Sequence, residues 1–459
     1  MTIPFNNLYD YIFSLTGHNN KNLIMYRFDP HGSKDLKNLI IHNELEIIKI
    51  PMISTGRKVI SFHYKLLFCY DQEPLNFNLY EGEKSQKHRK ELFFNSSEGL
   101  SHFDNDIGKK LLEKENIAGH PEVLPTIYDK KLLLHSEKNS KDLKKYENNG
   151  FLGIYYWSHA FIALDWYRFA EYDKSLVYPK YFKKDFNIYC RAWTGSREYR
   201  LKFLSMIKKE KISNQCNIFF NEYDAGYNFY DHKFKNNIWQ INDKEIQNIK
   251  DLNYNKNKDD NSSLSAAYTV KDYKESAIDI VLETVFDQKK VHLTEKILRP
   301  ISCGKPFILV SEKGSLEYLR SYGFKTFGHL IDERYDYIDS PEERLKFVMN
   351  TMKKISSLPK KEKADLFSEM HEIAKENKKW FFSENFFDII NDELKKNLQN
   401  GLSILDNEDC QTAKNIRIMY RSYRLYKKYI DDLSKNKINT FILEYPEKIR
   451  LSKENIKKY

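Results

Sequence analysis

Short apolar runs alternate with helical patterns along much of the chain. Each run holds four to six mostly apolar residues and is bounded by polar or turn-forming positions, which is typical of buried strands. Several intervening segments place apolar residues three and four positions apart, which predicts amphipathic helices. The predicted strands are 65–70, 152–157, 186–190, 216–220, 278–282, 306–310 and 324–327.

Three of the predicted helices carry recognisable signals at their ends. One begins at Thr294, and a second ends at Gly323, as expected for a C-cap glycine. A third begins with a capping box of Ser340 and Glu343, with Pro341 in the first turn. Helical spacing gives this third helix an apolar face made of Leu345, Val348, Met349, Met352 and Ile355.

Strands that alternate with helices predict parallel sheets joined by right-handed crossovers, and therefore an α/β fold. At roughly 100–200 residues per domain, 459 residues correspond to two or three domains. We expect two Rossmann-like, doubly wound domains over residues 1–185 and 186–340, followed by a helical C-terminal extension over 341–459. The polar stretches 136–149 and 250–263 are expected to be exposed loops.

Composition narrows the class of protein. The longest uncharged stretch, about residues 151–164, is shorter than the roughly 20 residues needed to cross a bilayer, so no transmembrane helix is predicted. The first residues lack the basic and apolar segments of a signal peptide, so we expect a soluble, cytoplasmic protein. The net charge of +10 favours a polyanionic partner only weakly, because Lys, Asn, Tyr and Phe are abundant together, as AT-rich coding produces.

The cysteines and histidines give no sign of a metal centre or a disulfide framework. The five cysteines are odd in number, lie far apart and form no CxxC pair, so we expect reduced thiols buried in the core. The thirteen histidines show no HExxH spacing, and the chain has no Walker loop and no GxGxxG motif. The cysteines are Cys69, Cys190, Cys216, Cys303 and Cys410.

Charged residues follow several of the predicted strands. In open α/β sheets, ligands bind beyond the carboxyl ends of the strands, so these residues are candidates for a site. Carboxylates, arginines and a lysine at a helix start together suit a phosphate-bearing sugar donor and an acceptor hydroxyl. The candidates are Asp71, Glu73, Arg191, Arg197, Arg200, Glu283, Glu295 and Lys296.

Three segments resemble the donor-site signature of the α1,3-fucosyltransferases: LETVF (282–286), LTEK (293–296) and KPFIL (305–309). Residues 200–207 resemble the arginine-led helix of the same family, so the resemblance extends over roughly residues 186–330. As a whole, the chain also looks like glycosyltransferases of tailed phages.

The resemblance implies a two-domain glycosyltransferase of the GT-B type that uses a nucleoside-diphosphate sugar and inverts the anomeric carbon, without a metal or other cofactor. It implies that Glu295, with Glu283 nearby, binds the ribose hydroxyls. It also implies that Lys296, the helix start and Arg200 bind the diphosphate. Fixed positive groups near the leaving diphosphate stabilise the charge that grows there in the transition state. The implied donor-binding residues are Arg191, Arg197, Arg200, Glu283, Thr294, Glu295 and Lys296.

An inverting transfer needs a base near the acceptor hydroxyl. Asp71 and Glu73 are the preferred candidates, because both lie just beyond a predicted strand of the N-terminal half. Asp165 is the rival, paired with His159 or Arg168. Each of these carboxylates also has a structural interpretation, as a turn cap or as a buried ion pair.

A basic, aromatic helix is predicted near the C-terminus. Its basic residues suit a phosphate backbone or anionic lipid, or else form the solvated face of a helix that packs on the N-terminal domain. The candidate acceptor is a hydroxymethylated pyrimidine in double-stranded phage DNA, in the host cytoplasm, or a surface or lipid-linked glycan. A polyanion-binding protein without catalysis is the alternative function. The basic residues are Arg417, Arg421, Arg424 and Lys428.

Overall fold

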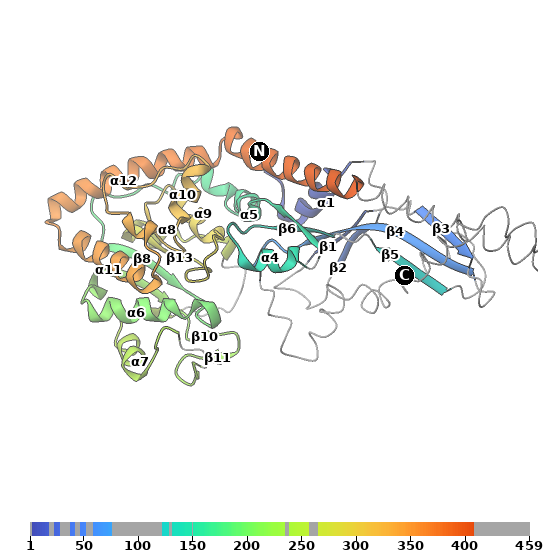
Figure 1. The fold of residues 1–459 in the computed structure, drawn as a ribbon. Helices are drawn as coiled ribbons and strands as arrows, with labels where there is room; N and C mark the ends of the chain where they lie inside the picture. Colours follow the sequence, from blue (N-terminus) through green and yellow to red (C-terminus); the bar gives the residue numbers. More distant parts are fainter. Residues whose placement is uncertain are drawn as a thin grey trace, which may run out of the picture.

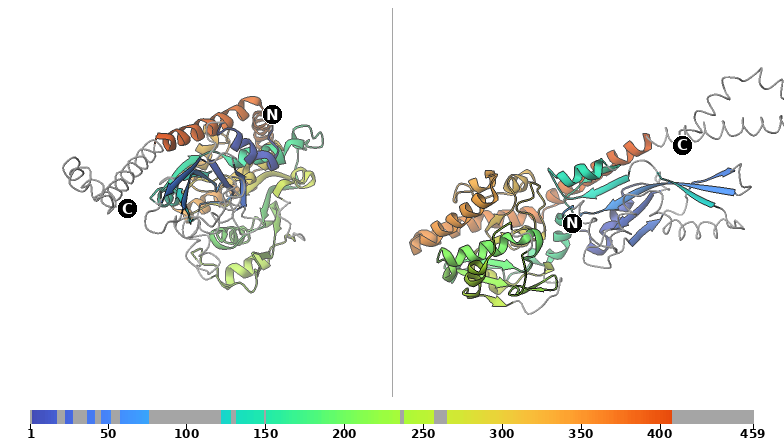
Figure 2. Two further views of the ribbon diagram at one scale, coloured as in Figure 1. Left: turned by 90° about the vertical axis from the view of Figure 1, so that its right-hand side faces the viewer. Right: turned by 60° about the horizontal axis from the view of Figure 1, so that its bottom comes forward.

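Two β-sheets, one from each half of the chain, form the framework of the molecule in a computed structural model (Figure 1). Helices cover the C-terminal sheet, and the N-terminal sheet extends away from it as a long, narrow second part (Figures 1 and 2). The structure describes residues 2–17, 23–27, 37–41, 46–51, 58–75, 122–127, 131–148, 150–234, 238–256 and 265–407.

The N-terminal sheet is mixed and depends on one long strand, β4. The carboxyl-terminal part of β4 pairs in parallel with β1 and β6, and its earlier part pairs with β3 and β5. Because β2 and β3 run antiparallel to their neighbours, the expectation of purely parallel pairing in this half was wrong. The strands are β1 (Leu23–Arg27), β2 (Lys37–Ile41), β3 (Glu46–Pro51), β4 (Lys58–Cys69), β5 (Glu122–Ile127), β6 (Lys131–His135) and β7 (Phe151–Tyr155).

The C-terminal sheet is parallel throughout, with strand order β12-β9-β8-β13-β14. Along the chain, β8, β9 and β12 therefore extend the sheet to one side, and β13 and β14 extend it to the other side. The boundary between β8 and β13 is a topological switch point, where open α/β sheets bind ligands. The strands are β8 (Lys184–Cys190), β9 (Cys216–Phe220), β12 (Asn255–Lys256), β13 (Ser276–Leu282) and β14 (Phe307–Val310).

Helices connect and cover these strands. In the C-terminal half, α6 (Tyr199–Lys209) follows β8, and α9 (Glu295–Ser302) joins β13 to β14. No helix among the described residues is both long enough and apolar enough to cross a membrane. The other elements are η1 (Phe5–Asn7), α1 (Leu8–Ser14), α4 (Lys141–Glu147), α5 (Ser158–Trp166), η3 (Arg168–Glu171), η4 (Gly195–Arg197), η5 (Ser213–Gln215), β10 (Tyr223–Asp224), β11 (Tyr227–Asn228), α7 (Asp243–Lys250), α8 (Val270–Glu275), α10 (Ser315–Ser321), η7 (Arg334–Tyr337), α11 (Pro341–Ser357), α12 (Lys360–Phe381) and a helix over 384–407.

The helix over residues 384–407 leaves the C-terminal half and returns to the N-terminal sheet (Figure 1). Its Asn397 donates a hydrogen bond of 2.8 Å from Nδ2 to the carbonyl oxygen of Tyr155, at the end of β7. Further along the helix, Asp406 forms an ion pair with Lys65 of β4. The two halves are therefore joined by this helix as well as by the direct contacts between them.

Direct contacts between the halves lie close to the start of α9. Lys138 and Val291 form an isolated antiparallel bridge, and the indole Nε1 of Trp157 donates to the carbonyl oxygen of Leu293 at 3.0 Å. Beside them, the buried Lys290 amino group lies 2.9 Å from a carboxylate oxygen of Glu137. These contacts hold the segment that leads into α9 against the N-terminal half.

Most of the predicted elements of the C-terminal half were confirmed. Strands β8, β9, β13 and β14 overlap the predicted runs, α11 begins after the N-cap Ser340, and its predicted apolar face is buried. The strand predicted at 324–327 was wrong, because side chains of Asn377 and Glu333 bond to the backbone of Lys325 and Phe327. The described cysteines are buried free thiols, whereas Cys410 lies outside the described residues.

The polar stretch 136–149 was expected to be an exposed loop, and this was wrong. Residues 141–147 form α4, whose N-cap Ser140 accepts a hydrogen bond from the amide of Leu143. Glu137 of the same stretch is buried at the junction of the two halves.

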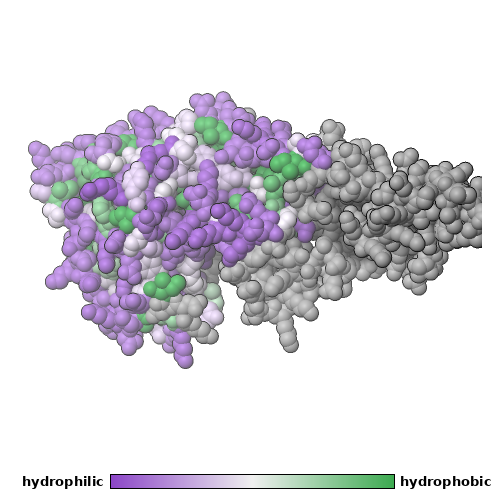
Figure 3. Space-filling model, in the orientation of Figure 1, coloured by the Kyte–Doolittle hydropathy of each residue, from purple (hydrophilic) through white to green (hydrophobic). Residues whose placement is uncertain are grey.

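On the face in Figure 3, hydrophilic residues cover most of the described surface and hydrophobic ones form small separate spots.

Two glycines at the ends of α10 offer a matched test of packing. Both have positive φ, 81° at Gly314 and 86° at Gly323, and a Cβ at Gly323 would lie 2.7 Å from Cζ2 of Trp380. A Cβ at Gly314 would meet nothing within 4 Å. Gly314→Ala should lower the free energy of unfolding by about 1–2 kcal/mol through backbone strain, and Gly323→Ala by at least about 1 kcal/mol more. Thermal unfolding of both variants checks this, and equal losses would contradict the Trp380 contact.

Candidate functional site

A cavity of about 1150 Å³ lies between the carboxyl ends of β8, β9 and β13 and the N-terminal half. A ligand site was expected at the carboxyl ends of the strands, and the cavity also lies at the switch point of the parallel sheet. From the N-terminal half it is lined by Gln72, Glu73, His159, Ile162 and Trp166, among others. From the C-terminal half the lining includes Tyr189, Arg191, Arg197, Arg200, Phe219, Tyr223, Asp272, Thr294, Glu295, Lys296 and Arg299.

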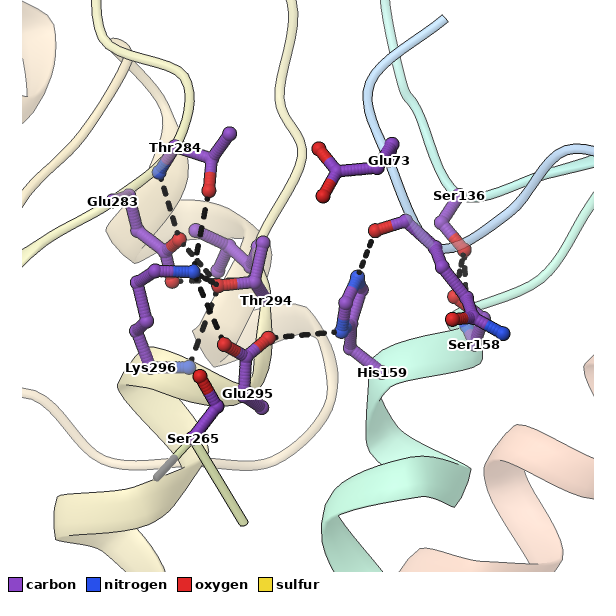
Figure 4. Close-up of polar contacts among 12 residues, drawn as sticks. Glu73, Ser136, Ser158, His159, Ser265, Glu283, Thr284, Thr294, Glu295 and Lys296 are labelled. Atoms are coloured by element: carbon purple, nitrogen blue, oxygen red, sulfur yellow. Dashed lines mark hydrogen bonds and ion pairs between the residues drawn. The ribbon is translucent and has the colours of Figure 1, made fainter. Parts of the chain in front are cut away.

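The start of α9 is held in place by a buried carboxylate (Figure 4). Glu283 is 0% exposed, and it accepts hydrogen bonds from the Thr294 amide at 3.2 Å, the Thr294 hydroxyl at 2.7 Å and the Thr284 amide at 3.1 Å. Thr294 is in turn the N-cap of α9, because its hydroxyl oxygen accepts from the amide of Lys296. Glu283 does not line the cavity, so its geometry assigns it to the helix start and not to a ribose.

The first turn of α9 carries two of the charged side chains that line the cavity, Glu295 and Lys296. Lys296 Nζ lies 3.1 Å from Glu295 Oε1, 3.1 Å from the hydroxyl of Thr294 and 3.3 Å from that of Thr284. The other carboxylate oxygen of Glu295 lies 3.2 Å from Nδ1 of His159, which belongs to α5 of the N-terminal half. The predicted pair of Glu295 and Lys296 is thus extended by a histidine from across the cavity.

The contacts among Lys296, Glu295 and His159 shift the pKa values of the two buried groups, Glu295 and His159. Burial alone would raise the pKa of Glu295, but the charge of Lys296 and the contact with His159 outweigh burial and hold that pKa well below its usual range. Burial alone would lower the pKa of His159, but the Glu295 carboxylate outweighs burial and raises it above its ordinary value. The structure therefore favours an ionised Glu295 opposite a protonated His159.

Arg191 and Arg197 line the cavity and contact side chains on its walls. Arg191 NH1 lies 3.4 Å from the hydroxyl of Ser265, and Arg197 NH2 lies 3.4 Å from a carboxylate oxygen of Glu73. The second contact joins the two halves across the cavity, and both of its side chains are partly exposed. Arg191, Arg197 and Lys296 thus bring three cationic side chains to one cavity.

Arg200 also lines the cavity, but its guanidinium is bonded to backbone carbonyl oxygens. Its residue is only 2% exposed, and its guanidinium donates to the carbonyl oxygens of Ala192 at 2.6 Å and of Leu282 and Glu283 at 2.8 Å. These bonds use both of its terminal nitrogens, so the expectation that Arg200 grips a diphosphate directly does not fit its geometry. Arg200 instead joins the segment after β8 to the end of β13 and adds positive charge at the site.

Asp71, one of the predicted bases, is buried away from the cavity. The carboxylate of Asp71 accepts hydrogen bonds from the hydroxyls of Tyr9, at 3.0 Å, and Tyr156. The residue is 1% exposed and does not line the cavity, whereas Glu73, two positions later, does. Asp71 is placed as a structural acceptor for tyrosine hydroxyls, which leaves Glu73 as the carboxylate of this pair at the site.

Asp165, the rival base, also lies outside the cavity lining. Its carboxylate accepts from the backbone amide of Phe5 at 3.0 Å and from Arg168 at 2.9 Å. The expected partner Arg168 is therefore present, whereas His159 faces Glu295 instead. Asp165 connects α5 to η1, and its geometry is that of an intramolecular ion pair.

Several lining residues were not predicted, because they become neighbours only when strands and helices pack. Tyr189 and Phe219 are register partners on β8 and β9, and their rings stack with centroids 4.9 Å apart. The guanidinium of Arg299 lies 4.4 Å from the centroid of Tyr189. From the sequence alone, His159 was considered only as a partner of Asp165. Flat aromatic surface of this kind suits a planar ring of a ligand.

Comparison with known proteins gives no family to which the chain can be assigned. The sequence matches no protein-family model and no curated protein.

Within the part of the chain that the structure describes, no group of three or more His, Cys, Asp or Glu side chains is arranged to hold a metal ion. The predicted basic residues Arg417, Arg421, Arg424 and Lys428 lie outside the described residues.

Geometry alone indicates what the cavity can bind. Cationic side chains at the start of a helix attract an anion such as a phosphate group. Glu73 brings a carboxylate from the opposite wall, and Tyr189 with Phe219 adds aromatic surface. The combination suits a ligand with an anionic part, a ring and a group that donates a proton.

The role of Glu283 at the helix start can be tested with two N-cap substitutions. Thr294→Val removes the cap and leaves a buried carboxylate without one donor, whereas Ser340→Ala removes only the exposed cap of α11. Losing a cap costs about 1 kcal/mol, and an unsatisfied buried group costs about 1–3 kcal/mol more. Thermal unfolding should therefore show a clearly larger loss for Thr294→Val. Similar losses in the two variants would argue against the assignment of Glu283.

Proposed function

We propose that this protein is a glycosyltransferase that transfers a sugar from a nucleoside-diphosphate sugar to an acceptor hydroxyl, with inversion at the anomeric carbon. The observation that carries the proposal is the juxtaposition of Lys296, Arg191 and Arg197 with Glu73 around one cavity at the switch point of a parallel sheet. Cations suit the leaving diphosphate, and a carboxylate on the opposite wall suits the acceptor.

The donor end of the cavity is formed by the C-terminal half. Lys296 and the amides at the start of α9 would face the diphosphate, with Arg191 and Arg197 on its other side. Glu295 would accept hydrogen bonds from hydroxyls of the ribose or sugar, because it stays ionised beside Lys296. As the bond between the anomeric carbon and the phosphate oxygen breaks, these cations stabilise the negative charge on the departing nucleoside diphosphate.

The acceptor end is formed by the N-terminal half, with Glu73 as the base. Glu73 takes the proton of the acceptor hydroxyl while the acceptor oxygen forms its bond to the anomeric carbon. Attack comes from the face opposite the leaving diphosphate, and the configuration therefore inverts. The arrangement of a donor-binding and an acceptor-binding half around one cavity is the GT-B type, which is part of the same proposal.

Lys296 provides the first test of the donor site. Lys296→Ala should weaken binding of nucleoside diphosphate about tenfold to a hundredfold, because a charged hydrogen bond contributes roughly 1.5–3 kcal/mol. Lys353→Ala is the control, since Lys353 pairs with Glu210 between α11 and α6, outside the cavity. Isothermal titration with a panel of nucleoside diphosphates gives both affinities. Equal affinities in the two variants would overturn the donor assignment.

Glu73 provides the test of catalysis. Glu73→Gln should abolish sugar transfer while nucleoside diphosphate still binds, because the amide cannot take a proton from the acceptor. Release of nucleoside diphosphate is measured with each sugar nucleotide, with hydroxymethylated double-stranded DNA and with oligosaccharides as acceptors. Asp71→Asn is the comparison, and it should lose stability more than turnover per folded molecule. Transfer by Glu73→Gln at the wild-type rate would remove the base assignment, and failure of the wild type with every donor would favour a non-catalytic binding protein.

A further inference from the structure

His159 is a buried side chain that contacts both sides of the cavity (Figure 4). It lies in the first turn of α5 and is 5% exposed. Its Nε2 lies 2.9 Å from the carbonyl oxygen of Gln72, in the loop after β4 that carries Glu73. Its Nδ1 lies 3.2 Å from the carboxylate of Glu295, the first residue of α9. One imidazole ring thus joins the loop of the proposed base to the helix start of the donor site.

The loop after β4 is fastened to the start of α5 at successive residues. The hydroxyl of Ser158 donates to the carbonyl oxygen of Asp71 at 2.6 Å, and His159 contacts the carbonyl oxygen of the next residue, Gln72. Glu73 follows directly along the chain. Its position at the cavity wall therefore depends on contacts made by the first turn of α5.

The protonation state of His159 decides whether both contacts can be made. The two atoms that face its ring nitrogens, a carbonyl oxygen and a carboxylate oxygen, are acceptors, and a neutral imidazole carries only one N–H. A neutral ring that donates to Gln72 would turn a lone pair toward the ionised Glu295. Only the imidazolium donates to both sides at once.

Charged and titratable groups face His159 from every element that packs against it. The carboxylates of Glu295 and Glu283 favour the imidazolium, and Lys296 opposes it. The ring of His292 lies at right angles, with centroids 5.3 Å apart, and burial holds the pKa of His292 well below its usual value. From the loop after β4, Glu73 lines the same cavity as His159, whereas the Asp71 carboxylate is bonded to the hydroxyls of Tyr9 and Tyr156. The closest of these groups, Glu295, decides the balance in favour of the charged ring.

We propose that His159 is a positioning residue that, as an imidazolium, couples the donor helix start at Glu295 to the loop that carries Glu73. The coupling rests on the proposed glycosyl transfer, in which donor and base have to be aligned within one cavity. The coupling predicts that Glu73 is correctly positioned only while His159 contacts both the carbonyl oxygen of Gln72 and the carboxylate of Glu295. Losing either contact therefore lowers turnover more than it lowers donor affinity.

Two substitutions separate the contacts of His159 in the full-length protein. His159→Gln keeps an amide near the position of Nε2, and His159→Asn keeps one near the position of Nδ1. Both should lower kcat about tenfold or more with a smaller change in KM for the donor, since each loses one charge-assisted contact. Wild-type turnover should fall as pH rises through the raised pKa of His159, and neither variant should show that step.

His371→Gln is the control for losing a buried histidine. His371 lies in α12, bonds to the carbonyl oxygen of Phe367 at 2.7 Å and does not line the cavity. This control should keep the wild-type pH profile of turnover. If either His159 variant keeps wild-type kcat and the wild-type pH profile, the coupling proposal is overturned.

Hydrogen exchange tests the coupling even if no sugar nucleotide is turned over. In the ligand-free wild type, protection of the amides in residues 71–75, corrected for intrinsic exchange, should fall as pH rises through the pKa of His159. Both His159 variants should lack this step, and His371→Gln should retain it. A step that persists in either His159 variant overturns the coupling, whereas lack of turnover by the wild type with every donor overturns only the proposed function.

Discussion

The site depends on one buried interaction, the clamp between the carboxylate of Glu283 and the amide and hydroxyl of Thr294. A buried carboxylate is stable only when its oxygens accept hydrogen bonds, so this group imposes a precise position on the residue that caps α9. The next two residues are Glu295 and Lys296, whose side chains line the cavity. Strand β13, through Glu283, therefore determines where the charged helix start lies.

The cationic side chains at the cavity differ in how deeply they are buried. Arg200 is buried and donates to the carbonyl oxygen of Ala192, just after β8, and to those of Leu282 and Glu283 at the end of β13. Arg191, Arg197 and Lys296 line the same cavity. Arg200 holds the segment after β8 to the end of β13, whereas Arg191, Arg197 and Lys296 contact the side chains of Ser265, Glu73 and Glu295 at the cavity. The N-terminal half completes the site with Glu73 and His159.

Much of the C-terminal half could be predicted from local patterns, because its strands are continuous apolar runs and its helices carry clear caps. In the N-terminal half, β4 and β7 overlap the strands predicted at 65–70 and 152–157. The antiparallel pairing of β2 and β3 could not be predicted, because an apolar run does not say whether its neighbour is parallel or antiparallel. Residues 324–327 also looked like a strand, but they bond to the side chains of Asn377 and Glu333, which come from distant positions. Side-chain partners of this kind leave no local signal.

The sequence by itself determined the α/β class, the start of α9 and the chemical character of the cavity residues, because strand length, capping and charge are local properties. Only the tertiary structure decided which charges meet a ligand. It buried Asp71 and Arg200 among hydrogen-bond partners and brought His159 to Glu295 across 136 positions of chain. Burial and pairing depend on which distant segments pack together, and spacing along the chain does not encode that directly.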